Sequence, residues 1–163
     1  PQKGEAGQRQ ELVAELALEA LLGSSSPLYA KLYQQGLINR NFSYGYEAYP
    51  GCAMLTVGGE SRDPWALREA IAAEAARIGR EGIGQELWDR LKKAAYGGRV
   101  RALNSFENIC VGLAQGHFAG AEHFRFPEVF EGISKSDVED CVRRWMSPER
   151  TALSVVKPKG EKV

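Results

Sequence analysis

The chain has little of what several classes of protein require. Its 163 residues include only three cysteines, two histidines and two methionines. Cys52, Cys110 and Cys141 are odd in number, far apart and each in an apolar stretch, so we expect reduced core thiols and no disulfide framework. No apolar run approaches the length that crosses a bilayer, and residues 1–10 are polar, unlike a secretory signal. A cytoplasmic protein without membrane contact is expected.

The chain also lacks an excess of positive or negative charge. Lys plus Arg and Asp plus Glu both number 21, so the formal net charge is zero, and basic residues cluster only in the short tail from Lys157 to Lys162. Binding to nucleic acid without base specificity draws its energy from clustered positive charge, so no nucleic-acid partner is expected. The 44% of hydrophobic and 26% of charged residues are typical of a soluble globular domain.

What is present is mostly helical periodicity. Ser26 before Pro27, Asp63 before Pro64, and Ser134 with Asp137 three residues later are typical helix starts. The pair Gly97-Gly98 predicts a break, because glycine weakens a helix interior. Helices are predicted at residues 11–22, 27–35, 64–78, from about 85 to 96, at 105–118 and from 134 to 146.

In other segments, apolar and polar residues alternate with a period of two. Residues 42–48 and 52–57 flank Pro50-Gly51 and predict a hairpin, and residues 151–156 predict a final strand. The order of elements indicates an α+β fold of two layers, in which an antiparallel sheet is covered on one face by helices. Three strands are too few for so many helices, so we expect strands N-terminal to Pro1 to be missing, and an open sheet edge that permits a homodimer. The expected organisation is a flexible segment at 1–10, one α+β domain at 11–158 and a tail at 159–163.

Only one group of side chains suggests a metal. His117, Glu122 and His123 carry zinc-ligand chemistry, but the histidines are six residues apart. Helical zinc sites place two histidines four residues apart so that both imidazoles point at one ion. We therefore expect a structural or surface role for these residues and no metal in this chain.

Aromatic residues gather in one part of the chain. Five of the six tyrosines fall within residues 29–49, together with Phe42. Strand alternation places Tyr44 and Tyr46 on the same face of the hairpin. Two interpretations stay open, namely an aromatic core or a groove that grips an extended peptide.

Three segments in this order resemble one family. The first is Ser24-Ser25-Ser26-Pro27-Leu28-Tyr29, continuing through Leu32-Tyr33 and Gly36-Leu37-Ile38 to Phe42-Ser43-Tyr44. The second comprises residues 64–78 and 84–91, and the third runs from Ile133 through Trp145 to Val156. Their order and spacing resemble those of the pitrilysin and insulinase-type zinc metallopeptidases, and above all those of the bacterial members. The resemblance implies an α+β domain like that of mitochondrial processing peptidase.

The resemblance implies a division of labour between two halves. In this family a catalytic half carries His-x-x-Glu-His and a distal Glu that hold zinc, and a non-catalytic half faces it across a chamber. Neither His117 nor His123 has a Glu three residues on and a His four residues on. The chain therefore resembles the non-catalytic, C-terminal half, inactive alone, with zinc in a partner catalytic half on the same or a paralogous polypeptide.

The resemblance also implies contacts with a peptide substrate. In many members the non-catalytic half supplies an Arg and a Tyr that reach the substrate. The Arg position falls here at Tyr33, which lacks a guanidinium, and Arg40 in an insertion is a candidate replacement. Tyr44, with Tyr46 as the second choice, corresponds to the Tyr. The alternative is a structural or assembly scaffold, in which the tyrosines are core and the helix face with Gly112 and Gly116 makes contacts.

Overall fold

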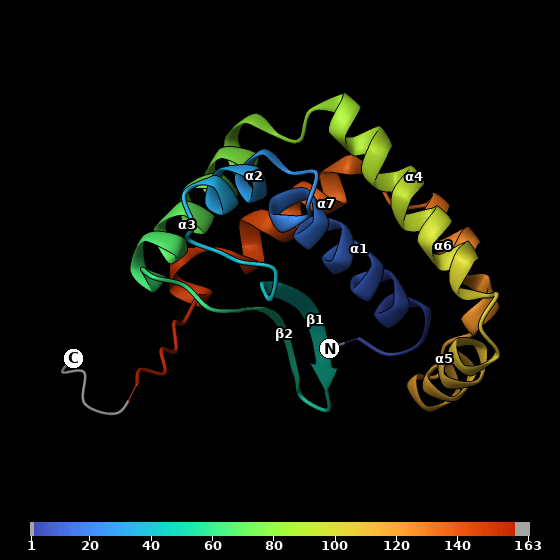
Figure 1. Cartoon of the computed structure of the whole chain (residues 1–163). Helices are drawn as coiled ribbons and strands as arrows, with labels where there is room; N and C mark the ends of the chain where they lie inside the picture. Colours follow the sequence, from blue (N-terminus) through green and yellow to red (C-terminus); the bar gives the residue numbers. More distant parts are fainter. Residues whose placement is uncertain (1, 159–163) are drawn as a thin grey trace.

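A computed structural model describes residues 2–158 and shows a β-hairpin lying against a layer of helices (Figure 1). This is the expected α+β arrangement of two layers, with an antiparallel sheet of two strands. The elements are α1 (Gly4–Leu22), α2 (Pro27–Gln34), β1 (Ser43–Tyr49), β2 (Cys52–Gly58), α3 (Pro64–Glu81), α4 (Gln85–Ala102), α5 (Phe106–Ala119), η1 (His123–Arg125), α6 (Phe126–Glu131), α7 (Lys135–Trp145) and η2 (Pro148–Arg150).

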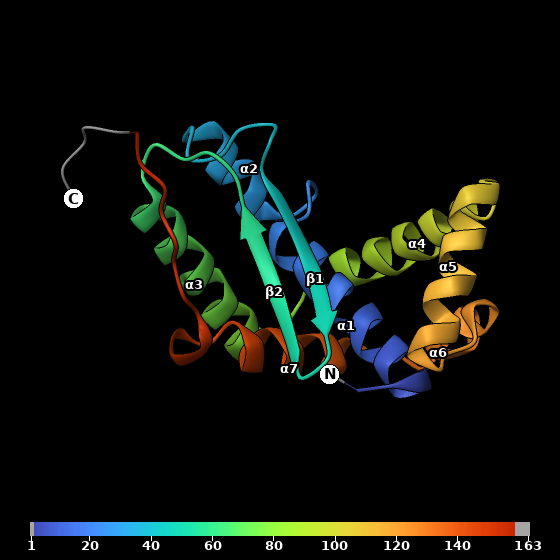
Figure 2. The ribbon, with the colours of Figure 1, turned by 90° about the horizontal axis from the view of Figure 1, so that it is seen from below.

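The core is built around α1. Nine residues of this helix between Leu12 and Leu22 are buried, because apolar side chains occupy most of its circumference. α1 is contacted by α7, α4, α6, α2 and the first strand of the hairpin, and α7 also packs against α3. Figure 2 shows the hairpin in front of α1, with α3 on one side and α4 and α5 on the other.

α1 begins at Gly4, earlier than the predicted start at Glu11, so most of the segment predicted to be flexible is helical. Its first turns are polar and carry no apolar pattern. Tertiary contacts hold them: Arg9 lies 2.8 Å from the carboxylate of Asp137, and Glu5 lies 3.1 Å from the guanidinium of Arg125. The predicted tail at 159–163 lies outside the described residues.

α4 runs through Gly97 and Gly98 without the predicted break. The cost of two glycines in a helix is about 1 kcal/mol each relative to alanine, which neighbouring contacts can offset. The ring of Tyr96 lies 5.7 Å from that of Phe126, and Arg99 forms an ion pair with α1. Contacts on both sides of the glycines therefore keep the helix continuous.

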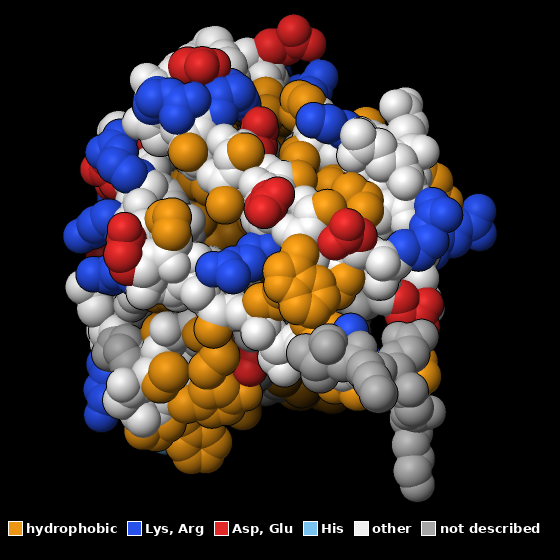
Figure 3. Space-filling view, turned by 90° about the vertical axis from the view of Figure 1, so that its left-hand side faces the viewer, with side chains coloured by type: hydrophobic (Ala, Val, Ile, Leu, Met, Phe, Trp, Pro, Cys, Tyr) orange, Lys and Arg blue, Asp and Glu red, His pale blue; other side chains and the backbone are white. Residues whose placement is uncertain are grey.

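The predicted strand at 151–156 is wrong as a sheet strand. These residues are extended, but within residues 2–158 the sheet contains β1 and β2 alone. A cavity of about 520 Å³ separates the segment from β2, so the two backbones form no ladder. Figure 3 shows this side of the molecule, where hydrophobic side chains gather among charged ones.

The expectation that all three cysteines are core thiols is correct for one of them and wrong for two. Cys141 is buried on α7, and burial raises the pKa of its thiol to about 11. Cys52 at the hairpin turn and Cys110 on α5 are exposed, so they are not core thiols. No helix in the described part of the chain is long and apolar enough to cross a bilayer.

The glycine face of α5 is covered by the chain itself. A side chain at Gly112 would collide with the imidazole of His123, and one at Gly116 would lie 2.8 Å from the carbonyl oxygen of Ala121. These glycines allow the loop after α5 to fold back over the helix. The face that the scaffold alternative assigned to contacts with another protein is therefore occupied.

Candidate functional site: a cleft at the open edge of the hairpin

The two strands of the hairpin present different faces. Tyr44 pairs with Val57 and Tyr46 with Leu55, and all four side chains pack against the helical core. The alternate positions, such as Gly45 opposite Thr56, face away from the helices. Tyr44 and Tyr46 thus share one face, as alternation predicts, and that face points toward α1.

A cavity of about 730 Å³ lies between β1, α1 and α4. Tyr44 and Tyr46 line the cavity with their side chains, and Gly45 between them, which has no side chain, also lines it. The backbone of β1 therefore borders the cavity. Within residues 2–158, β1 pairs only with β2, which leaves its other edge open. The lining residues used below are Glu11, Glu15 and Glu19 from α1, Tyr44, Gly45 and Tyr46 from β1, and Gly98 and Arg99 from α4.

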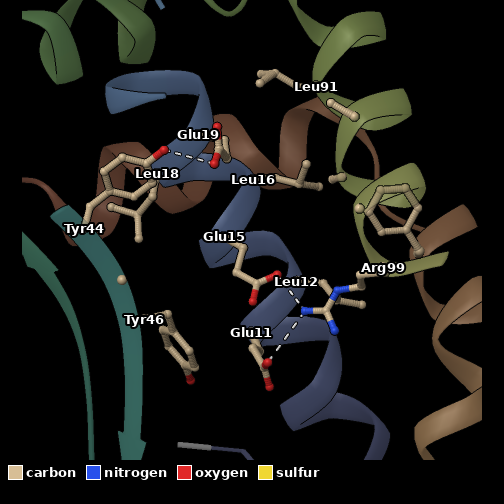
Figure 4. A pocket seen from close by; sticks show the side chains of 15 residues that line it. Glu11, Leu12, Glu15, Leu16, Leu18, Glu19, Tyr44, Tyr46, Leu91 and Arg99 are labelled. Atoms are coloured by element: carbon tan, nitrogen blue, oxygen red, sulfur yellow. Dashed lines mark hydrogen bonds and ion pairs between the residues drawn. The ribbon is translucent and has the colours of Figure 1, made fainter. Parts of the chain in front are cut away.

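Acidic side chains run along one wall of the cavity (Figure 4). Glu11, Glu15 and Glu19 are spaced one helical turn apart and therefore lie on the same side of α1. Arg99 reaches from α4 to within 2.6 Å of Glu15 and 3.6 Å of Glu11. The hydroxyl of Tyr44 donates a hydrogen bond of 2.9 Å to Glu19.

The electrostatics of the cavity follow from partial burial. Burial raises the pKa of Glu11, and the neighbouring Glu15 adds to the increase while Arg99 opposes it. Burial, with the charge of Glu19 and the hydrogen bond to it, raises the pKa of Tyr44 far above its ordinary value. Burial likewise raises the pKa of Tyr46, followed by the charge of Glu11. Both tyrosines therefore remain neutral hydrogen-bonding groups at neutral pH.

The other two predicted contact residues lie outside the cavity. Tyr33 on α2 is 46% exposed and stacks on Tyr29 with ring centres 6.2 Å apart. Arg40 is exposed in the turn between α2 and β1, where the backbone amide of Asn41 donates a 2.8 Å hydrogen bond to the side chain of Asn39. The structure thus brings Tyr44 and Tyr46 together but not Tyr33 and Arg40.

The two histidines make contacts with other parts of the chain. His123 lies over Gly112, while His117 on α5 stacks edge to face with Phe118, with ring centres 5.7 Å apart. Among the described residues, no three His, Cys, Asp or Glu side chains converge as ligands would. The chemistry that the lining of the cavity offers is hydrogen bonding and charge.

Sequence analysis missed the acidic wall and its arginine. The spacing of Glu11, Glu15 and Glu19 is visible in the sequence and could have indicated one shared helical side. That this side faces β1 depends on tertiary packing. Arg99 lies 84 residues from Glu15 in the chain, so no local pattern relates the two side chains.

Comparison with known proteins identifies the family. The model of the peptidase M16 inactive domain matches residues 2–95, more than half of the chain. The uncharacterized zinc protease YmfH of Bacillus subtilis is 32% identical over 152 residues, which cover 93% of this chain and 35% of that protein. This chain therefore belongs to the peptidase M16, or pitrilysin, family and corresponds to its non-catalytic C-terminal domain.

Two solved structures share the fold. An M16-like peptidase from Alicyclobacillus acidocaldarius has a TM-score of 0.80 and 25% identity, covering 86% of this chain and 34% of that one. A predicted insulinase family protease from Yersinia pestis has a TM-score of 0.65 and 15% identity, covering 99% and 39%. The resemblance found in the sequence is confirmed. The chain spans about a third of the length of these relatives.

Proposed function

We propose that this domain is the non-catalytic wall of a peptidase chamber and that it holds a short or unfolded peptide along the open edge of β1. Hydrolysis then takes place in a separate half that carries His-x-x-Glu-His and its zinc. The observation that carries the proposal is the cavity of about 730 Å³ beside an unpaired strand. Its volume lies within the range of about 300–1,000 Å³ typical of ligand pockets.

An extended peptide can use each part of this cleft. The open edge of β1 offers backbone donors and acceptors, which bind a peptide strand without regard to its sequence. The rings of Tyr44 and Tyr46 add apolar surface, and the carboxylates on α1 accept hydrogen bonds from amide or ammonium groups of the peptide. Arg40 and Tyr33, which precede β1, are proposed to contact the peptide where it leaves the cleft.

A specific contact favours a second candidate function, that of a structural scaffold. The hydroxyl of Tyr44 is already engaged by Glu19, so this tyrosine joins the sheet to α1 as well as lining the cleft. In a scaffold, the tyrosines fix the hairpin and the cleft is filled by another part of the protein. Peptide binding distinguishes the two functions.

A test fills the cleft without disturbing the core. A side chain at Gly98 meets no atom within 4 Å at its Cβ position, and Gly98 lines the cavity. Gly97 offers the same free space but does not line the cavity, which makes Gly97→Trp the matched control for Gly98→Trp. Each variant is mixed with a His-x-x-Glu-His-bearing catalytic half, and cleavage of a quenched, unstructured fluorogenic peptide is measured.

We expect cleavage only in the mixture, a loss of most activity with Gly98→Trp, and wild-type activity with Gly97→Trp. Equal activity of both variants would contradict peptide binding in the cleft and favour the scaffold. Thermal unfolding of each variant controls for misfolding.

A further inference from the structure

The charge in the cleft beside β1 is unbalanced. The charged residues that line its cavity are Glu11, Glu15, Glu19 and Arg99, which supply three carboxylates and one guanidinium. The whole chain has equal numbers of acidic and basic residues, so the cavity differs in charge from the molecule as a whole. An excess of one sign in a partly enclosed site attracts ligands of the opposite sign. The cavity therefore favours a cation.

The acidic residues of α1 lack basic partners on their own helix. On α3, Arg77 lies 2.7 Å from Glu74, and on α7, Arg143 lies 2.7 Å from Asp140, in each case within one helical turn. The sequence of α1 contains no lysine or arginine after Arg9, so its carboxylates follow one another at intervals of one turn. Like charges at this spacing destabilise a helix. A cation bound in the cleft would relieve that repulsion.

Glu11 is the carboxylate of this wall with the most capacity for a ligand. Arg99 lies 2.6 Å from Glu15 but 3.6 Å from Glu11, and Glu19 accepts the hydrogen bond of Tyr44 at 2.9 Å. The Glu11 side chain is 49% exposed. An ionised carboxylate accepts several hydrogen bonds, so its oxygens can bind a further donor that enters the cavity.

The ring of Tyr46 supplies the opposite side of this position. Figure 4 shows Tyr46 on β1 and Glu11 on α1 across the cleft from each other, and both line the cavity. An aromatic ring attracts an ammonium or guanidinium and packs against its apolar stem, while a carboxylate accepts its hydrogen bonds. A peptide strand on the open edge of β1 places alternate side chains on the face that Tyr46 occupies. One of these side chains can thus reach between the ring and the carboxylate.

We propose that the cleft selects peptides that carry a lysine or arginine side chain, which binds between the carboxylate of Glu11 and the ring of Tyr46. This inference rests on the proposed binding of a peptide along β1 and adds the class of peptide. Backbone hydrogen bonds at the strand edge hold the peptide without regard to its sequence. The cationic side chain determines which of its residues lies beside Tyr46, so Glu11 is a specificity-determining residue.

Binding of matched peptides to the 163-residue chain tests the proposal. The host is a short unstructured peptide of alanine and threonine, acetylated and amidated at its ends, with lysine, arginine, glutamine or glutamate at its centre. Isothermal titration calorimetry measures each dissociation constant. We expect the lysine and arginine peptides to bind at least about 10-fold more tightly than the glutamine peptide, and the glutamate peptide to bind most weakly.

Two results would separate this proposal from the proposed function. Equal affinities of all four peptides would overturn the selection of cations and leave peptide binding along β1 in place. No binding of any peptide would overturn both. The glutamine peptide with a free N-terminal amine is a further arm. If it bound as tightly as the capped lysine peptide, the terminal ammonium would be the cation that binds, and the proposed role of a side chain would be overturned.

Substitutions at Glu11 test the assigned residue. Glu11→Gln should reduce the preference for lysine over glutamine to below about threefold, because the carboxylate is lost. Glu11→Lys should reverse the preference, so that the glutamate peptide binds more tightly than the lysine peptide, and this gain cannot arise from misfolding. The matched control is Glu86→Gln, which removes the same charge from an exposed side chain outside the cavity and should keep the full preference. An undiminished preference for lysine in Glu11→Gln would overturn the proposal.

Discussion

At the scale of single residues, Tyr44 connects the hairpin to the central helix. Its ring packs against the core, and its hydroxyl reaches the carboxylate of Glu19 at 2.9 Å. Sequence alternation predicts which face the ring occupies, but not this hydrogen bond across 25 positions. Tyr49, at the end of the same strand, donates a 2.8 Å hydrogen bond to Glu47 but is 55% exposed. The two tyrosines make the same kind of bond at different depths.

We therefore expect Tyr44→Phe to destabilise the domain and Tyr49→Phe to leave it nearly unchanged. Loss of a hydrogen bond between a half-buried hydroxyl and a carboxylate costs about 1–2 kcal/mol, since the carboxylate loses its partner. At an exposed site water replaces the hydroxyl. Urea unfolding at pH 7 measures both variants, and equal losses from the two would contradict a structural role for the Tyr44–Glu19 bond.

At the scale of elements, the start of α7 shows how a short sequence signal is completed by tertiary contacts. The hydroxyl of Ser134 accepts from the amide of Asp137, and the carboxylate of Asp137 accepts from the amide of Ser134 at 2.8 Å. The sequence predicts this capping box. Arg9 on α1 adds an ion pair of 2.8 Å to Asp137, which no local pattern indicates.

The capping box makes the free energy of unfolding depend on pH. The hydroxyl and amide of Ser134, with Arg9, lower the pKa of Asp137 to about 2. The folded state therefore favours the ionised carboxylate, so its stabilisation is complete above the unfolded-state pKa near 4 and is lost as the pH falls toward about 2. We expect the difference in unfolding free energy between the wild type and Asp137→Asn to shrink over that range, as urea unfolding can show.

The control for this experiment lies on the same helix. Asp140 forms an exposed ion pair with Arg143 at 2.7 Å, and such pairs contribute little to stability. Asp140→Asn should change the urea midpoint only slightly at pH 6. A difference for Asp137→Asn that is equally large at pH 2.5 and at pH 6 would contradict the assigned role of the carboxylate.

At the scale of the whole molecule, local signals predict the elements better than their partners. The starts at Pro27, Pro64 and Lys135 follow from capping residues, and the hairpin follows from alternation around Pro50-Gly51. The polar first turns of α1 and the continuity of α4 depend on contacts between distant segments. Whether residues 151–156 join a sheet also depends on distant segments, and within residues 2–158 they pair with no strand. Periodicity alone carries no information on those contacts.

Local sequence patterns likewise predict only part of the candidate site. The side shared by Tyr44 and Tyr46 follows from the period of a strand, whereas the acidic wall opposite them and the position of Arg99 arise from packing of α1 and α4 against the hairpin. The resemblance to the family depends on the order of several segments along the chain, because no single motif among them is specific enough to identify the family. The cleft thus emerges only when three elements meet.

An NMR titration of the 163-residue chain with an unstructured peptide tests peptide binding along β1 most directly. The account predicts shifts of backbone amides at Ser43–Tyr49 and in the parts of α1 and α4 that line the cleft, with the shifts absent in Gly98→Trp and retained in Gly97→Trp. Amides of α3 should not move. Absence of shifts along β1, or shifts of equal size in both tryptophan variants, would contradict the account.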